Sequence, residues 1–301
     1  MSSSIRASGF QRIGLLFAWF ALGCSLMAQG PLTTEAIELA GAGQLEEAER
    51  RIADAMASNE SHDPMTWYVR GFILKELYVA EGRLIGSPRR TEAVAAALGC
   101  IERDADGAMM RWLRPLLNFL GDTYLDDARA AIPSVRPGAP VDAEAHFRQY
   151  VEVRRLLDSE WDEEAEWVLL MQQLGEAALA ECAAEERAAA GPWFELGTGF
   201  YARAATRDHD RYRSTYNQAV HTYNQGVREF KAAEDDLDAI DDALNRAARH
   251  WNVASDLREA ALARFPDRSD GYEALAIVSE ALLKQDRIEW CKTHIEELGG
   301  R

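Results

Sequence analysis

The segment 36–71 constrains the fold of this chain more than any other, because small residues fall in it at the spacing of helix faces. Gly43 lies between two helical stretches, where a glycine commonly ends the first of them. In the second stretch Ala48, Ile52 and Ala55 share one face at the i, i+4, i+7 spacing. A small residue such as Ala48 lets two helix backbones approach closely, so the segment predicts a pair of short helices packed against each other.

A third helix is predicted to begin at Pro64, a residue favoured in the first helical turn. Trp67 lies one helical turn before Gly71 in this stretch, so a large ring neighbours a position without a side chain. The pattern therefore indicates one helix pair followed by the start of another.

This arrangement resembles the tetratricopeptide repeat, a helix–turn–helix unit of about 34 residues with preferred small and aromatic positions. Trp67, Gly71 and Leu74 match the first half of such a unit. Further matches lie in the second half of the chain: Tyr223, Asn224 and Gly226, then Ala239, Ala243 and Ala247, and then Ala254, Ala261, Pro266, Tyr272 and Leu275. The chain is also similar to exported repeat proteins of the Bacteroidetes.

The resemblance implies an all-α fold in which antiparallel helix pairs stack into a short right-handed superhelix, a TPR-like solenoid. It also implies a protein-binding or peptide-binding scaffold with no cofactor, whose groove is lined by the first helix of each pair. Carried over residue by residue, the groove positions are Tyr68, Phe72 and Lys75, then Tyr223, Val227 and Phe230, and then Glu273, Ile277 and Glu280.

Hydrophobic periodicity predicts helices along the whole chain after the leader. Their ranges are 33–41, 45–58, 65–81, 89–104, 108–130, 142–157, 160–188, 192–206, 209–233, 236–264, 269–283 and 286–298. The segment 132–141 holds three of the nine prolines and is predicted to be a linker. It divides an N-terminal TPR-like helical block, 31–131, from a C-terminal one, 142–301.

The first 28 residues are typical of a signal peptide, with Arg6 and Arg12 ahead of the apolar run 13–27. The expected mature chain begins at Gln29 and is exported to the periplasm or beyond, with no membrane span. Cys24 leaves a second interpretation open, an outer-membrane lipoprotein acylated at that residue. A retained N-terminal anchor is a third.

Charge excludes one class of partner. The sequence has 33 basic and 50 acidic residues, and removing the two leader arginines leaves 31 against 50, a net charge of −19. Nucleic-acid affinity depends on lysines and arginines that neutralise phosphates, so nucleic acid is not expected as a partner. An acidic surface favours solubility and basic partners.

Motifs for catalysis are missing from the sequence. None of the six histidines is part of a His-Glu-x-x-His pattern, and neither a Gly-x-Ser-x-Gly elbow nor a phosphate-binding glycine loop occurs. Cys291 and His294 lie one turn apart, but two further metal ligands would have to come from elsewhere. The chain is therefore predicted not to be an enzyme.

Two acidic segments and three cysteines have structural interpretations. The segment 102–107 imitates half of a calcium loop, but Leu113 occupies the place of the bidentate glutamate, so a helix-to-helix turn is predicted. The acidic run 235–242 is expected to stabilise a helix start, with binding of a cation or basic peptide as the alternative. The cysteines of the mature chain, expected as small buried residues or as one disulfide plus a free thiol, are Cys100, Cys182 and Cys291.

A different functional class also stays open. Some carbohydrate-binding lipoproteins use helical repeats, so the chain could be a surface-tethered subunit that binds a glycan or nutrient. The aromatic residues that would then stack on sugar rings are Trp193, Phe194, Phe200 and Tyr201. A second aromatic group, Trp161 and Trp167 with Leu174, is expected to pack in the core.

Overall fold

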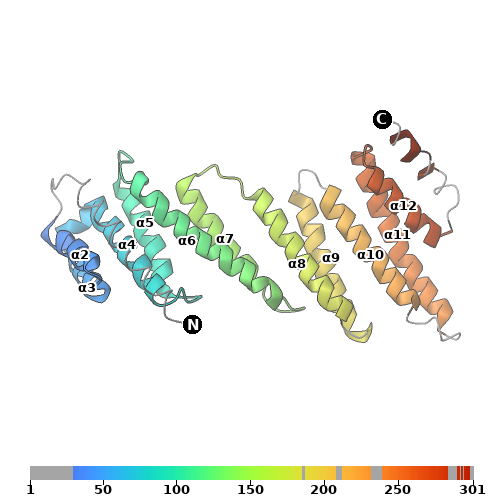
Figure 1. Cartoon of the computed structure of the whole chain (residues 1–301), viewed down its shortest axis with the longest axis horizontal. Helices are drawn as coiled ribbons and strands as arrows, with labels where there is room; N and C mark the ends of the chain where they lie inside the picture. Colours follow the sequence, from blue (N-terminus) through green and yellow to red (C-terminus); the bar gives the residue numbers. More distant parts are fainter. Residues whose placement is uncertain are drawn as a thin grey trace, which may run out of the picture. The chain divides into compact units, whose positions relative to one another are not determined.

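The computed structural model describes residues 30–184, 187–207, 212–231, 239–283, 290, 291, 293 and 295–298 (Figure 1). This part of the chain is all-helical and contains no strand. The helices are α2 (Pro31–Gly41), α3 (Leu45–Met56), α4 (Pro64–Ala80), α5 (Pro88–Arg103), α6 (Met110–Ala131), α7 (Asp142–Leu157), α8 (Glu164–Ala184), α9 (Arg187–Arg207), α10 (Tyr212–Lys231), α11 (Ile240–Arg264) and α12 (Ser269–Ala281). Two short 3-10 helices are η1 (Asn59–His62) and η2 (Ile132–Ser134).

The helices pack in adjacent pairs, as the sequence predicted. Contacts are most extensive between α2 and α3, α4 and α5, α8 and α9, and α10 and α11. The chain divides into two compact units. The first unit comprises Met1–Asp127 and His146–Trp161, and the second comprises Ala128–Ala145 and Asp162–Arg301. The block boundaries predicted around the linker 132–141 stay a prediction.

Small residues bring the helices of the first unit together. Ala48, Ile52 and Ala55 of α3 are fully buried, as their spacing predicted. A Cβ on Gly71 of α4 would lie 3.3 Å from both a backbone oxygen of α5 and a side-chain carbon of α6, so this glycine sets the distance to both neighbours. The ring of Trp67 lies against Gly99 of α5, at a position where a Cβ would be 2.2 Å from the ring.

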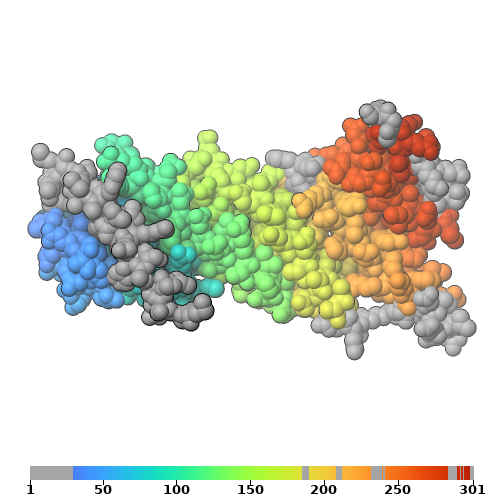
Figure 2. Space-filling model, in the orientation of Figure 1, coloured from blue at the N-terminus to red at the C-terminus, as the bar shows by residue number. Residues whose placement is uncertain are grey.

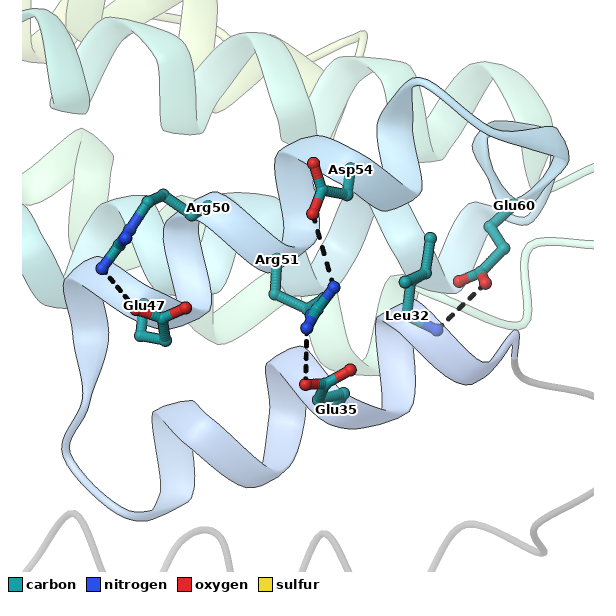
Figure 3. Close-up of polar contacts among 7 residues, drawn as sticks. All are labelled: Leu32, Glu35, Glu47, Arg50, Arg51, Asp54 and Glu60. Carbon is teal, nitrogen blue, oxygen red and sulfur yellow. Dashed lines mark hydrogen bonds and ion pairs between the residues drawn. The ribbon is translucent and has the colours of Figure 1, made fainter.

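The start of α2 is capped from a distant part of the chain (Figure 3). Gly30 precedes this helix and has no side chain to accept its first N–H groups. Glu60 of η1 accepts them instead, from the backbone of Leu32 at 3.0 Å and of Thr33 at 2.8 Å, and also accepts from the Thr33 hydroxyl at 2.7 Å. Burial raises the pKa of the Glu60 carboxyl, but the hydrogen bonds from Thr33 and Leu32 outweigh burial and hold it below its usual value.

Replacing Glu60 by glutamine is expected to lower the free energy of unfolding of the first unit by about 1 kcal/mol at pH 7, since a charged cap is lost. Because the pKa of Glu60 is lowered on folding, its charge stabilises the unit above the ordinary value of 4.5 and ceases to do so as the pH falls through the folded value. Urea unfolding at pH 7 and pH 3, followed by circular dichroism, should therefore show a difference at pH 7 that is smaller at pH 3.

A matched control for this prediction lies on the capped helix itself. Glu38 is an exposed carboxylate of α2, and Glu38→Gln removes the same charge without touching the cap. Its free energy of unfolding should stay within about 0.5 kcal/mol of the parent. An equal loss in both variants would contradict the capping role of Glu60.

Ion pairs on the same helices are at least partly exposed to solvent and contribute little. Arg51 of α3 reaches Glu35 of α2 at 2.8 Å and Asp54 of its own helix at 3.5 Å, and Arg50 pairs with Glu47 (Figure 3). Solvent screens such pairs. Burial of small residues between α2 and α3 is therefore the main source of their packing energy.

The second unit contains a closer helix contact than the first. Gly175 of α8 and Gly197 of α9 face each other, and a Cβ on either would lie 3.1 Å from the backbone oxygen of the other. Gly226 of α10 similarly lies against Trp251 and the backbone of α11. In Figure 2 the side chains of α10, α11 and α12, drawn orange to red, form a continuous packed surface.

Three predicted helix starts differ from those of the described helices by four or five residues. The helix expected at 160–188 begins at Glu164, because the Asp162 carboxylate accepts from the Glu164 N–H at 2.9 Å and caps the helix there. The helix expected at 192–206 begins at Arg187 and contains Pro192. The helix expected at 236–264 begins at Ile240.

Several predictions concern residues outside the described ones. They include the signal peptide 1–28, the lipidation candidate Cys24, positions 235–238 of the acidic run, and positions 286–289, 292 and 294 of the last predicted helix. None of the helices in the described part is long and apolar enough to span a membrane.

Candidate functional site

The groove residues predicted on α4 lie at different depths in the first unit. Tyr68 is 6% exposed and belongs to the core. Phe72, one turn further along, is half-buried, with its ring centroid 6.4 Å from that of Tyr68. Lys75 places its Nζ 4.5 Å from the Phe72 ring centroid, within cation–π distance. Phe72 and Lys75 therefore reach the surface of α4, whereas Tyr68 supports them from below.

A second ring completes this surface. Phe119 of α6 is half-buried, and its centroid lies 5.4 Å from Lys75 Nζ and 5.0 Å from the guanidinium carbon of Arg83. We refer to Phe72, Lys75, Arg83 and Phe119 as the cation–aromatic cluster. It combines side chains of α4, of the α4–α5 loop and of α6, with two rings and two cations.

Backbone geometry explains why these side chains meet. The absence of a side chain at Gly71 lets α6 approach α4, with Leu116 of α6 as the contact. Arg83 follows the end of α4 with a φ of 59°, in the left-handed region. Its backbone N–H donates to the backbone oxygen of Tyr78 at 3.0 Å. A residue other than glycine costs free energy in that conformation, so the turn that directs Arg83 is held by its surroundings.

The two cations of the cluster differ in their partners. Lys75 is hydrogen-bonded to the carboxylate of Glu76, its neighbour in sequence, and both side chains are largely buried. Arg83 is exposed and makes no ion pair with the described carboxylates. The Arg83 guanidinium is therefore the group in the cluster that can bind an anionic group of a partner.

Two apolar residues stand beside the cluster. Leu84 is 60% exposed and Ile85 is 63% exposed, in a turn closed by a hydrogen bond from the Ser87 N–H to the Leu84 oxygen at 3.1 Å. Gly82 and Gly86 flank them with positive φ values of 81° and 77°. The turn presents two neighbouring large apolar side chains to solvent.

Sequence reasoning found half of this cluster. Phe72 and Lys75 came from the carry-over of groove positions, whereas Phe119 and Arg83 were missed. Applied from Trp112, the same offsets give Leu113, Leu117 and Leu120, which are buried, so the carry-over does not reach Phe119. The orientation of Arg83 depends on a left-handed turn that has no glycine at that position, so no sequence signal marks it.

The second predicted groove set packs in the core of the second unit. Tyr223, Val227 and Phe230 of α10 are half-buried against a cluster that contains Trp251 and Val278. The ring centroids of Tyr223 and Phe230 lie 6.3 Å and 6.4 Å from that of Trp251. Most of their apolar area is therefore occupied by α11 and α12.

The third predicted set lies on the outer face of α12. Glu273, Ile277 and Glu280 are all exposed, and Ile277 is 51% exposed, whereas Val278 of the same helix is buried. These residues are available to a partner, whereas the Tyr223 set packs against Trp251 of α11 and Val278 of α12.

The aromatic residues considered for sugar stacking are largely unavailable. Trp193 and Phe200 are buried, and Tyr201 is fully buried against Gly175 with its ring stacked on His221. Only Phe194 is half-buried, and His250 contacts it edge-on. Burial of these rings corrects the expectation that they form an exposed platform.

The described residues include no cluster of three or more metal-binding side chains. The acidic segment 102–107 is the turn that the sequence predicted, with Asp104 accepting from the Met109 N–H at 2.7 Å. The three cysteines are buried and free, as expected for small core residues. Burial, together with nearby Asp104, raises the pKa of the Cys100 thiol to about 12, so it stays protonated.

Comparisons with known proteins add little to this geometry. No family model matches the chain, and no curated protein matches it. Among solved structures, the chain is similar to a nuclear import adaptor, the hypoxic regulator of sterol synthesis Nro1, at 13% sequence identity and a TM-score of 0.29. The alignment covers 97% of this chain and 94% of that chain. At this TM-score the likeness does not establish a shared fold, and the site has to be judged on its own geometry.

Proposed function

We propose that this protein is an exported tetratricopeptide-repeat-like scaffold that binds a protein or peptide partner in the bacterial cell envelope. The observation that carries the proposal is the cation–aromatic cluster of the first unit, in which two rings and two cations from three segments share one surface. Aromatic and arginine side chains contribute most of the binding energy at protein interfaces.

The neighbouring turn supports the same proposal. Leu84 and Ile85 are exposed next to Arg83, so apolar contact area adjoins the cationic group. A centre of apolar and aromatic side chains beside a charged group is the usual composition of a protein interface. Export rests on the leader sequence, in which basic residues precede the apolar run 13–27.

Site-specific photo-crosslinking tests the proposal in the producing cell. A benzophenone amino acid in place of Ile85 is expected to give a discrete crosslinked adduct in the envelope fraction. Replacing both Phe119 and Arg83 by alanine in that protein should reduce the adduct at least fivefold, because the loss of about 1 kcal/mol or more of contact energy weakens partner binding by that factor.

A crosslinker at Leu244 of α11 provides the matched control. Leu244 is also exposed, at 45%, but lies in the second unit, so this position should give no adduct that depends on Phe119 or Arg83. Equal adducts from both positions, or an adduct at position 85 that survives the double substitution, would rule out the cluster as the binding surface.

A further inference from the structure

The connection between α4 and α5, residues 81–87, is braced at its base. The Glu81 carboxylate accepts from the Ser87 hydroxyl at 3.3 Å and pairs with Arg89 at 3.0 Å. The Ser87 side chain is buried, and its backbone N–H closes the turn on the Leu84 oxygen. These contacts fix the conformation of the connection before any partner binds. We refer to residues 81–87 as the α4–α5 turn.

The middle of the α4–α5 turn stands away from the rest of the described chain. A Cβ at Gly82 or at Gly86 would have no described atom within 4 Å, and Leu84 and Ile85 between them are exposed. Side chains that are already held in place lose less conformational freedom when a partner covers them. The turn therefore offers two apolar side chains in an arrangement suited to binding.

Arg83 adds a cation to this apolar pair. Its guanidinium carbon lies 5.0 Å from the centroid of Phe119, and Leu84 follows it in the turn. A phenyl ring attracts a cation without neutralising its charge. The planar guanidinium also carries donors that match the two oxygens of a carboxylate. Among the described residues no carboxylate forms an ion pair with Arg83, so these donors are available to a partner.

Apolar area borders the Arg83 guanidinium in two directions. The ring of Phe119 approaches it from α6, and Leu84 and Ile85 continue from it along the turn. A terminal carboxylate has a residue of its own chain on one side only, whereas a side-chain carboxylate within a segment has neighbours on both sides. The arrangement therefore favours a side-chain carboxylate that is flanked by apolar residues.

Charge limits the partner to few acidic groups. The second cation of the cation–aromatic cluster, Lys75, is already paired with Glu76, so one guanidinium is left to match one carboxylate. The chain as a whole carries a net charge of −17, which repels polyacidic segments and anionic membrane surfaces. A single acidic side chain in apolar surroundings fits these conditions better than either.

We propose that the α4–α5 turn and Phe119 bind a segment of another protein in which one aspartate or glutamate lies between large apolar residues. The carboxylate would pair with Arg83, and the flanking residues would contact Phe119 on one side and Leu84 with Ile85 on the other. The inference rests on the proposed function and adds the chemistry of the partner.

A short peptide tests this chemistry on the expected mature chain, residues 29–301. Residues two apart share a face in an extended chain, so the probe is an acetylated and amidated peptide of leucine, serine, glutamate, serine and leucine, in that order. Its control has glutamine in place of the glutamate. Line broadening of the peptide's NMR signals should give a Kd of about 1 mM for the probe and binding about fivefold weaker for the control.

Substitutions of Arg83 connect this preference to one side chain. Arg83→Gln should bind both peptides equally, with the affinity that the parent has for the glutamine peptide, because the charge pair is absent in each case. Arg83→Lys keeps the charge without the planar donors and should retain part of the preference. Circular dichroism checks that the variants fold.

Two further variants serve as controls. Arg114→Gln removes the same charge from an exposed position of α6, outside the cation–aromatic cluster, and should leave both Kd values unchanged. Replacing both Leu84 and Ile85 by serine should weaken both peptides about fivefold and preserve the ratio between them, since the apolar contact is lost and the charge pair stays.

Several results would overturn the proposal. No binding of the probe at about 10 mM is one, and equal binding of the two peptides by the parent is another. Equal weakening by Arg83→Gln and Arg114→Gln would reduce the effect to net charge. Tighter binding of the glutamine peptide with a free C-terminal carboxylate would assign the site to a chain end.

Other occupants of the turn have their own signatures. Flotation with vesicles of phosphatidylglycerol and phosphatidylethanolamine that the double serine variant loses would assign the turn to a membrane, and self-association that this variant loses in sedimentation would assign it to a second copy of the chain. Either result would overturn the proposal.

The crosslinking test at position 85 keeps this inference separate from the proposed function. An adduct together with equal binding of the two peptides would support the scaffold and overturn its carboxylate-bearing partner. A preference for the glutamate peptide without an adduct would support the chemistry of the site and overturn the scaffold.

Discussion

Replacing Gly197 by alanine is expected to lower the free energy of unfolding of the second unit by about 2 kcal/mol. The new methyl group would lie 2.5 Å from Leu179 Cγ and 3.1 Å from the Gly175 backbone oxygen. Leu179 can change rotamer, but the backbone of α8 cannot give way without moving the helix. The gain in helix propensity, about 0.5–1 kcal/mol, only partly offsets this overpacking. Urea unfolding followed by circular dichroism measures the difference.

Gly199 provides the control on the same helix. It lies two residues further along α9 with no atom within 4 Å of the position of a Cβ. Gly199→Ala should therefore raise the free energy of unfolding by about 0.5–1 kcal/mol, because only the propensity and entropy effects remain. Destabilisation by both substitutions would mean that α9 tolerates no added methyl group, and it would refute the importance of the α8–α9 contact.

Much of the helical architecture could be predicted, because helix packing repeats a simple pattern. The apolar positions Ala48, Ile52 and Ala55 mark the contact face of α3 in the sequence, and all three are buried in the structure. The contact between Gly175 and Gly197 could not be predicted. Both residues lie inside helical stretches, where a lone glycine signals either a weak helix or a close approach, and the sequence does not distinguish these cases.

The candidate site was predictable only where it follows helix periodicity. Phe72 and Lys75 share a face of α4 because they are one turn apart. Arg83 joins them through a left-handed turn, and Phe119 joins them through a contact between α4 and α6. Such contacts depend on tertiary packing between residues far apart in the chain.

Replacing Arg90 by methionine is expected to lower the free energy of unfolding of the first unit by about 3 kcal/mol. Arg90 is only 2% exposed, and its Nη1 lies 2.6 Å from the Asp127 carboxylate and donates to the Tyr78 hydroxyl at 3.2 Å. Its guanidinium also stacks on Tyr124, 3.8 Å from the ring centroid. Methionine fills a similar space but leaves the largely buried Asp127 carboxylate without its cation.

The variant Arg89→Met tests whether the loss of stability comes from breaking a buried ion pair or from removing any arginine charge. Arg89 pairs with Glu81 at 3.0 Å and Glu49 at 3.5 Å, but these carboxylates are solvent-accessible, so Arg89→Met should cost no more than about 1 kcal/mol. Adding Asp127→Leu to Arg90→Met removes the stranded charge and should restore most of the lost stability. If Arg89→Met were as damaging, or if the double variant were no more stable than Arg90→Met, the unpaired carboxylate would not be the cause. Stacking of the guanidinium on Tyr124 would then account for the loss, since both Arg90 variants lack it.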